Sequence, residues 1–154
     1  MIFRLAVLIS VVAIAYGGLP DVGQCDENSA GLFPHPDECQ LYFDCSSIET
    51  TSWQPGVKGL RECEYPKLFD EFSRKCMKNV QCGSRKVKKN GCDYYTNQCQ
   101  GNHCRPCELD FPKCEGLKDG TYPHPLKKGS PQCIVCKNER FIVEKTCPVS
   151  VLST

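Results

Sequence analysis

The chain has 154 residues, of which 14 are cysteine and 11 are proline. This composition excludes a fold that depends on one large hydrophobic core, so disulfide bridges, each worth roughly 2–4 kcal/mol, must supply much of the stability. The formal net charge of +1 argues against nucleic acid or an anionic membrane as the main partner and favours an uncharged one. The charge is uneven, since residues 18–82 carry 6 basic and 11 acidic side chains and residues 83–154 carry 12 and 7.

Residues 1–17 have the pattern of a secretory signal peptide. Arg4 precedes an apolar run over residues 5–15, and small residues stand at Ala15 and Gly17, as a signal peptidase requires. Cleavage after Ala15 is an alternative to cleavage after Gly17. An uncleaved membrane anchor is disfavoured because a membrane span needs about 20 apolar residues. The sequence therefore predicts a secreted protein with no membrane attachment after cleavage.

The even number of cysteines in an exported chain indicates disulfides before it indicates metal, because the compartment outside the cell is oxidising. Two pairs, Cys104-x-x-Cys107 and Cys133-x-x-Cys136, would suit a zinc ribbon in a cytosolic protein, with His103 as an additional ligand. In an exported chain the disulfide interpretation is stronger, and no βαβ pattern supports a redox site. We therefore expect small disulfide-stapled modules that are poor in helix and use no metal or cofactor.

Residues 31–45 predict a turn that leads into a strand. Gly31, Pro34 and Pro36 exclude a helix, because each proline removes a backbone donor and favours extended geometry in the residue before it. From Cys39 onward the side chains alternate between two faces. One face carries cysteines and apolar residues, and the other carries a ring between an amide and a carboxylate: Gln40, Tyr42 and Asp44. Such a face can stack on a sugar ring and hydrogen-bond its hydroxyls.

Six cysteines between residues 25 and 82 are separated by 13, 5, 17, 12 and 5 residues. This spacing, together with the Gly31–Pro36 motif, the Tyr42-Phe43 pair and the Leu68–Asp70 motif, resembles the peritrophin-A family of chitin-binding domains. The resemblance implies a small β-sheet domain over residues 18–82 that binds chitin. It also implies three bridges, which would join Cys25 with Cys45, Cys39 with Cys82, and Cys63 with Cys76.

The sequence departs from the family pattern in two places. After Cys63 the usual Cys-Pro-x-Gly is replaced by Glu64-Tyr65-Pro66, which alters the turn there. An acidic, hydroxyl-rich hairpin over residues 46–52 is longer than in many relatives and leads to Trp53, just before a Pro-Gly turn. These departures bear on the geometry of the ligand site more than on the fold.

Most rings in a small disulfide-rich domain fill the core. We assign four of them to it: Phe33, Phe43, Phe69 and Phe72. Tyr42 and Trp53 are the ligand candidates, because Tyr42 faces away from the cysteines and Trp53 lies at a hairpin end. The predicted chitin-binding residues are therefore Gln40, Tyr42, Asp44 and Trp53.

Residues 83–91 are small and basic and show no apolar periodicity, so we interpret them as an exposed linker. A patch for acidic partners or a proteolytic site is the alternative interpretation.

The region over residues 92–154 is cysteine-rich and repeats the opening theme. Cys114 is followed after five residues by Gly-Thr-Tyr-Pro-His-Pro, just as Cys25 is followed after five by Gly-Leu-Phe-Pro-His-Pro. Cys133 and Cys136 stand where the next two cysteines stood, and residues 137–140 predict a hairpin turn. We interpret residues 114–147 as a truncated, diverged peritrophin-like half-module, completed by bridges to the segment from Cys92 to Cys107.

No catalytic motif is visible, because the chain lacks a Gly-x-Ser-x-Gly elbow, a His-Glu-x-x-His helix and a phosphate-binding glycine loop. His35 and His124 occupy the same Pro-His-Pro turn, which favours a structural role. A glycosidase needs two carboxylates held across a preorganised cleft, and a module of this size has little material for one. The available carboxylates are Asp37, Glu38, Asp44 and Asp70, of which Asp70 is better explained by a turn. We expect no enzyme activity.

The sequence as a whole predicts a small disulfide-rich, mostly β fold, with one complete peritrophin-A-like module followed by a diverged cysteine-rich half-module. The expected function is that of a secreted, non-catalytic chitin-binding protein of an extracellular matrix, such as a gut lining, a cuticle or the organic matrix of a shell. Its expected partners are chitin and other matrix proteins, with no nucleic acid and no membrane. The alternative is a cysteine-rich defence protein or enzyme inhibitor, which would act in solution and ignore the polymer.

Overall fold

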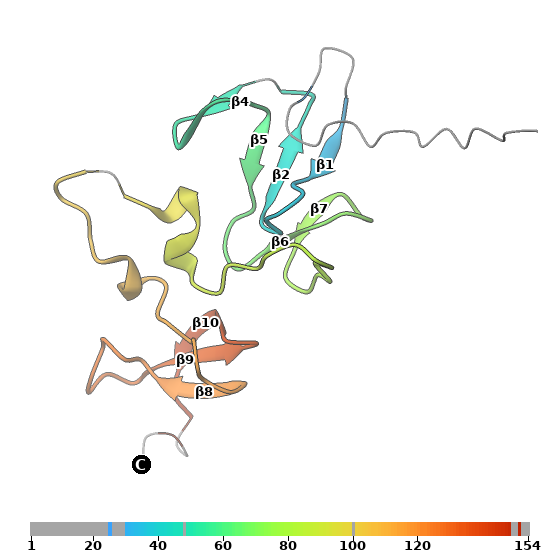
Figure 1. The fold of residues 1–154 in the computed structure, drawn as a ribbon. Coiled ribbons are helices and arrows are strands. Elements are labelled where there is room, and N and C mark those ends of the chain that lie inside the picture. The colour runs from blue at the N-terminus through green and yellow to red at the C-terminus, as the bar shows by residue number, and fades with distance from the viewer. Residues whose placement is uncertain (1–24, 26–29, 48, 100, 149–150, 152–154) are drawn as a thin grey trace, which may run out of the picture.

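The computed structural model describes residues 25, 30–47, 49–99, 101–148 and 151, and the predicted signal peptide lies outside these residues. Two three-stranded antiparallel sheets lie in opposite halves of the molecule (Figure 1). We call residues 25–82 the first half and residues 92–148 the second half. All cysteines are in disulfides, and no helix in the described part of the chain is long and apolar enough to span a bilayer. The prediction of a small, disulfide-rich, mostly β fold is confirmed.

The first half consists of one three-stranded sheet and two short hairpins. Its strands are β1 (Leu32–Pro34), β2 (Leu41–Asp44), β3 (Thr50–Thr51), β4 (Gln54–Lys58), β5 (Leu60–Glu62), β6 (Leu68–Asp70) and β7 (Lys75–Met77). The sheet has the order β1-β2-β5, while β3 pairs with β4 and β6 with β7. Leu41, Phe43 and Leu60 form a buried cluster with Cys25, because alternation along β2 places Leu41 and Phe43 on one face.

Three bridges hold the first half together, and they join the pairs that the resemblance implies: Cys25 with Cys45, Cys39 with Cys82, and Cys63 with Cys76. The first bridge ties the chain before β1 to the end of β2. The second ties the start of β2 to the segment after β7, and the third ties the end of β5 to β7.

The predicted core is correct for two of its four phenylalanines and wrong for one. Phe43 and Phe69 are buried, and Phe33 is partly buried against the cluster around Phe43. Phe72 is 84% exposed, because it lies in the turn that joins β6 to β7 rather than in a strand.

The sheet of the second half has the order β10-β9-β8. Its strands are β8 (Gly120–Pro123), β9 (Gln132–Lys137) and β10 (Arg140–Thr146). The hairpin turn predicted at residues 137–140 is present, and Asn138 and Glu139 at its centre have φ angles of 51° and 58°. A positive φ at both central positions is the geometry that suits the twist of a two-residue hairpin.

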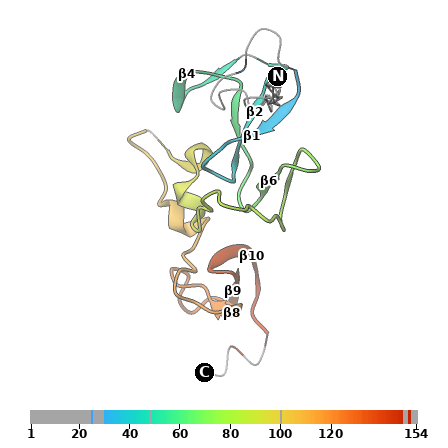
Figure 2. The same cartoon turned by 45° about the vertical axis from the view of Figure 1, so that its right-hand side comes forward.

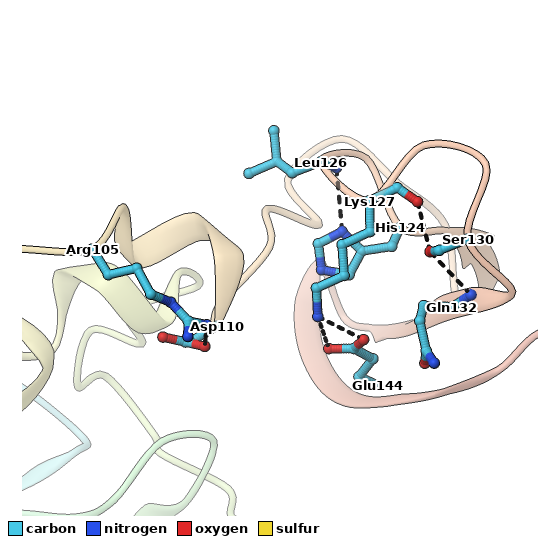
Figure 3. Close-up of polar contacts among 8 residues, drawn as sticks. All are labelled: Arg105, Asp110, His124, Leu126, Lys127, Ser130, Gln132 and Glu144. Atoms are coloured by element: carbon cyan, nitrogen blue, oxygen red, sulfur yellow. Dashed lines mark hydrogen bonds and ion pairs between the residues drawn. The ribbon is translucent and has the colours of Figure 1, made fainter.

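Both halves use the Pro-His-Pro motif in the same way. His35 N donates to Leu41 O at 3.1 Å, and His124 N donates to Gln132 O at 2.9 Å, which starts the pairing with the next strand. His35 Nδ1 accepts from the backbone of Asp37 and Glu38, and His124 Nδ1 accepts from Leu126 N (Figure 3). Each imidazole therefore caps its own turn, which is the structural role that the duplication favours.

The bridges of the second half correct one prediction. Cys114 pairs with Cys136 and Cys133 pairs with Cys147, while the earlier segment closes on itself through two further bridges, Cys92 with Cys107 and Cys99 with Cys104. No bridge completes residues 114–147 from that segment, because β10 returns alongside β9 and brings Cys147 back to the start of β9. The likeness between the two sheets is one of strand order and turn, and the assignment of a second peritrophin-like half-module stays a prediction.

A common core joins the two halves. The segment that leads from one sheet to the other contains three 3-10 helices, η1 (Gly91–Asp93), η2 (Tyr95–Asn97) and η3 (Cys107–Leu109) (Figure 2). Tyr65 of the first half packs edge-on against Tyr94 and Phe111 of the second, with ring centroids 5.1 and 5.5 Å apart. The same cluster contains Ile134 and Phe141 from the second sheet.

Residues 83–91, predicted as an exposed linker, are fixed along part of their length. Lys86 pairs with Glu38 in an isolated β-bridge, in which Cys39 N donates to Lys86 O at 2.9 Å. Asn90 is buried and its side chain accepts from Cys92 N, which caps η1. The β-bridge was not predictable from composition, because it uses the backbone of the segment rather than its side chains.

Candidate functional site

A groove lies where the β3–β4 hairpin of the first half meets η2 of the second. Trp53, in the turn of the hairpin, stacks on Tyr95 with ring centroids 4.7 Å apart and planes only 3° from parallel. Beside the two rings the groove encloses about 550 Å³ and is lined by Thr51, Ser52, Thr96 and Gln98. We call it the Trp53–Tyr95 groove.

Two polar contacts hold Tyr95 in place. The Glu62 carboxylate at the end of β5 accepts from Thr96 N at 2.8 Å and from Thr96 Oγ1 at 3.0 Å, which fixes η2 to the first sheet. Lys88 Nζ lies 3.8 Å from the centroid of the Tyr95 ring, a cation–π contact. Lys88 is itself fixed by an ion pair with Glu38 at 3.2 Å. Burial raises the pKa of Glu62, and the hydrogen bonds from Thr96 partly offset this effect.

Trp53 packs against the apolar core of the first half. The ring of Trp53 is partly buried against the cluster formed by Leu41, Phe43 and Leu60. A second hollow of about 250 Å³ opens beside the same two rings and is lined on its inner side by that cluster. The ring of Trp53 is therefore fixed by packing and partly exposed. Because it is already fixed, its side chain loses little conformational entropy when a ligand binds to it.

The lining of the Trp53–Tyr95 groove is uncharged. It combines two aromatic rings with three hydroxyl side chains and one amide, so it offers apolar stacking area together with hydrogen-bond donors and acceptors. Carboxylates are not among the lining residues, and acid–base hydrolysis of a glycoside needs two of them. The chemistry of the groove therefore suits binding of a neutral, hydroxyl-rich ligand.

Of the sequence-predicted site residues, Gln40 does not have the outward orientation that the alternation predicted. Its side chain is 0% exposed, and its Nε2 donates to a carboxylate oxygen of Glu38. Its backbone oxygen accepts from Cys63 N at 2.8 Å, which holds the residue under the chain that follows β5. The alternation of faces was counted from Cys39, but β2 begins only at Leu41, so Gln40 does not share the face of Tyr42.

Tyr42 and Asp44 are partly buried and already engaged. The ring of Tyr42 stacks on Phe69 with centroids 4.7 Å apart, and burial raises the pKa of its hydroxyl. Asp44 Oδ1 accepts from Ser46 N at 3.1 Å and so caps the turn after β2. Tyr42 alternates with Phe43 along β2, and Trp53 packs on the cluster of Phe43. The structure therefore does not bring Tyr42 and Trp53 to the same face.

Tyr95 is the residue that sequence reasoning missed. The adjacent Tyr94 and Tyr95 were visible between two cysteines, but nothing in their spacing indicated that one ring would be buried and the other would reach the first half. The signal lies in the next residue, because Thr96 supplies both donors to Glu62. No motif in the sequence connects the two positions.

The two Cys-x-x-Cys pairs are taken up in disulfides with other partners. Within the described residues no group of three or more histidine, cysteine or acidic side chains is placed to hold a metal ion.

Comparison with known proteins gives one result that bears on the first half. The family model described as chitin binding peritrophin-A domain matches residues 25–86. Comparisons with curated proteins and with solved structures gave no match. The matched residues contain the sheet β1-β2-β5, its three bridges and Trp53, whereas Tyr95 lies beyond the matched end. Residues 25–86 of this chain are a chitin-binding peritrophin-A domain.

Proposed function

We propose that this is a secreted, non-catalytic chitin-binding protein of an extracellular matrix, and that it holds the polymer in the Trp53–Tyr95 groove. The family match supports chitin as the ligand. The observation that carries the choice of site is the stacked pair of rings in an uncharged groove at the edge of the matched domain. The set of disulfides, which uses every cysteine, suits an oxidising compartment, as does the signal-peptide pattern at residues 1–17.

In this proposal the apolar face of an N-acetylglucosamine ring lies against the exposed part of the Trp53 ring, because the faces of the Tyr95 ring are already in contact with Trp53 and Lys88. Hydroxyl and acetamido groups of the sugar then exchange hydrogen bonds with Ser52 and Gln98. The contact with Trp53 contributes on the order of 1 kcal/mol by analogy with aromatic pairs, and Tyr95 contributes by holding the Trp53 ring in place. Because neither the lining nor chitin carries much charge, few counterions are released on binding, and salt has little effect.

Retention on chitin beads tests the proposal, with cellulose beads as the polymer control. Trp53→Ala and Tyr95→Ala should each weaken retention several-fold at both low and high salt. Phe72→Ala is the matched control, because it removes a ring that is 84% exposed and outside the groove. A thermal melt of each variant checks that the fold is kept.

Three outcomes would contradict the site or the ligand. Equal retention of Trp53→Ala and the unchanged protein removes the groove from the binding site. A loss confined to Tyr42→Ala moves chitin to the opposite face of the sheet. Retention that collapses in salt identifies an acidic ligand rather than chitin.

A further inference from the structure

A further cavity, distinct from the Trp53–Tyr95 groove and from the hollow beside it, lies between the two halves. It encloses about 600 Å³, a volume in the range of small-molecule sites. The first half contributes the stretch after β7, and the second half contributes the β9–β10 turn. Its lining includes four cationic side chains, Lys78, Lys89, Lys137 and Arg140, and no carboxylate. We call it the basic cavity.

Arg140 is the most unusual residue of the basic cavity. Its side chain is only 6% exposed, yet it forms no ion pair within the described residues. Its Nη2 donates to Tyr94 Oη at 2.8 Å, and its guanidinium lies 5.1 Å from the centroid of Tyr65. Its Nε has no hydrogen-bond partner among the residues that the structure describes. Both rings are neutral phenols, so no counter-charge for the buried cation is present in the described part of the chain. A buried charge is costly unless an opposite charge compensates it.

The lysines around Arg140 add to the excess of positive charge. Lys89 pairs with the carboxylate of Glu139, whose other oxygen accepts from Gly116 N at 3.1 Å. Lys78 and Lys137 are exposed, and neither makes an ion pair in the described part of the chain. One carboxylate thus compensates one of four cations, which leaves a field that attracts anions into the cavity.

We propose that the basic cavity binds an anionic sugar unit of an acidic polysaccharide. A sulfate ester or carboxylate on the sugar would lie between Lys137 and Lys78 and compensate the charge of Arg140. The amide side chains of Asn79, Gln81 and Asn138, which also line the cavity, would hydrogen-bond the hydroxyls. The chain would then hold a neutral polymer in one site and an acidic one in the other.

The lining favours a sugar over other anionic ligands. The lining contains no aromatic ring, so a nucleotide base would have nothing to stack on. Beside the charges there are three amides and small apolar walls from Val80 and Val87. This mixture suits a compact ring with one charge and several hydroxyls. An extended acidic peptide binds most readily along a free strand edge.

Isothermal titration of the full chain tests the proposal with three probes of equal length: a chondroitin sulfate hexasaccharide, its desulfated form, and a neutral cellulose hexasaccharide, which is not the ligand proposed for the Trp53–Tyr95 groove. The two chondroitin probes separate sulfate from carboxylate as the recognised group. We expect the sulfated probe to be bound at least about tenfold tighter at the basic cavity than the neutral one. Each removed lysine contact should lower the salt dependence of log K by about one.

The variants are Lys78→Gln and Lys137→Gln, which remove exposed charges and leave the core untouched. Lys113→Gln is the matched control, because Lys113 is exposed and does not line the cavity. We expect each cavity variant to weaken binding of the sulfated probe about fivefold, and the control and Trp53→Ala to leave it unchanged. Retention of both cavity variants on chitin should be normal, so this proposal and the proposed chitin site fail independently.

The proposal is overturned if neither chondroitin probe is bound more tightly than the neutral one. It is also overturned if Lys113→Gln weakens binding as much as Lys137→Gln does, since that would indicate attraction to the overall charge. Binding of a polyglutamate peptide in place of both chondroitin probes, with loss in the same two variants, would assign the cavity to an acidic protein.

Discussion

The hydroxyl of Tyr94 hydrogen-bonds residues of both halves, so removing it tests whether they fold together. Its ring is completely buried, and its hydroxyl donates to Lys67 O at 3.0 Å and accepts from Arg140 Nη2 at 2.8 Å. Tyr94→Phe keeps the ring and removes both bonds. It also leaves Arg140 with a second nitrogen that has no partner, next to the Nε that already lacks one.

The expected loss of stability follows from these two bonds. A neutral hydrogen bond contributes about 1 kcal/mol, and one that involves a charged group about 1.5–3 kcal/mol. Tyr94→Phe should therefore lower the free energy of unfolding by about 2.5–4 kcal/mol, which for a chain of this size lowers Tm by about 5–16 °C. Because the residue bonds both halves, the unchanged protein should unfold in a single transition.

Differential scanning calorimetry of the full chain measures both quantities. The matched control is Tyr122→Phe, which removes a hydroxyl that donates to Lys118 O at 2.9 Å in an exposed position. The control should cost less than about 1 kcal/mol, since water replaces the lost bond. Equal shifts in the two variants would refute the role given to Tyr94. Two separate transitions in the unchanged protein would refute the common core.

Two further predictions concern stability. Gly59→Ala should cost about 3 kcal/mol in a denaturant titration, because a Cβ there would lie 2.7 Å from Asp44 O at a φ of +70°. Gly56→Ala, with a φ of +92° but open space, should cost about 1 kcal/mol, and equal costs would exclude the clash. Burial raises the pKa of Tyr65 to about 12, whereas an unfolded tyrosine titrates near about 10. The folded state therefore keeps a proton that the unfolded state loses, so stability present below pH 10 falls as pH rises toward 12. Tyr65→Phe should flatten this fall, and an unchanged slope would contradict it.

The elements that the sequence predicted well are those fixed by local chemistry. The prolines and histidine of the Pro-His-Pro motif determine a turn by themselves. In both halves the histidine Nδ1, of His35 or His124, accepts a hydrogen bond from the backbone N–H two residues later. The β9–β10 hairpin follows from two apolar runs with a polar turn between them. The three bridges of the first half depended on the resemblance, because six cysteines alone allow 15 pairings.

The predictions that failed required knowledge of where a strand begins or what packs on it. Alternation assigns faces only inside a strand, and Gln40 lies one residue before β2. Phe72 has an apolar side chain of the kind that fills cores, but it lies in a tight turn and its ring is exposed. The position of Tyr95 depends on the contact between Thr96 and Glu62, which are 34 residues apart in the sequence. No periodicity in the sequence encodes a contact of that range.

The departure from the family pattern after Cys63 has a physical role in this chain. The replaced turn contains Tyr65, whose ring is buried against Tyr94 and Phe111 and whose hydroxyl donates to Lys89 O at 3.1 Å. Without the second half this ring would be exposed to water, and Trp53 would lose Tyr95 as its stacking partner. The match to the family model ends at residue 86. The packing of the matched domain and its candidate groove, however, are completed only by residues 89–111. The unit that forms this packing and this groove is longer than the unit that the family describes.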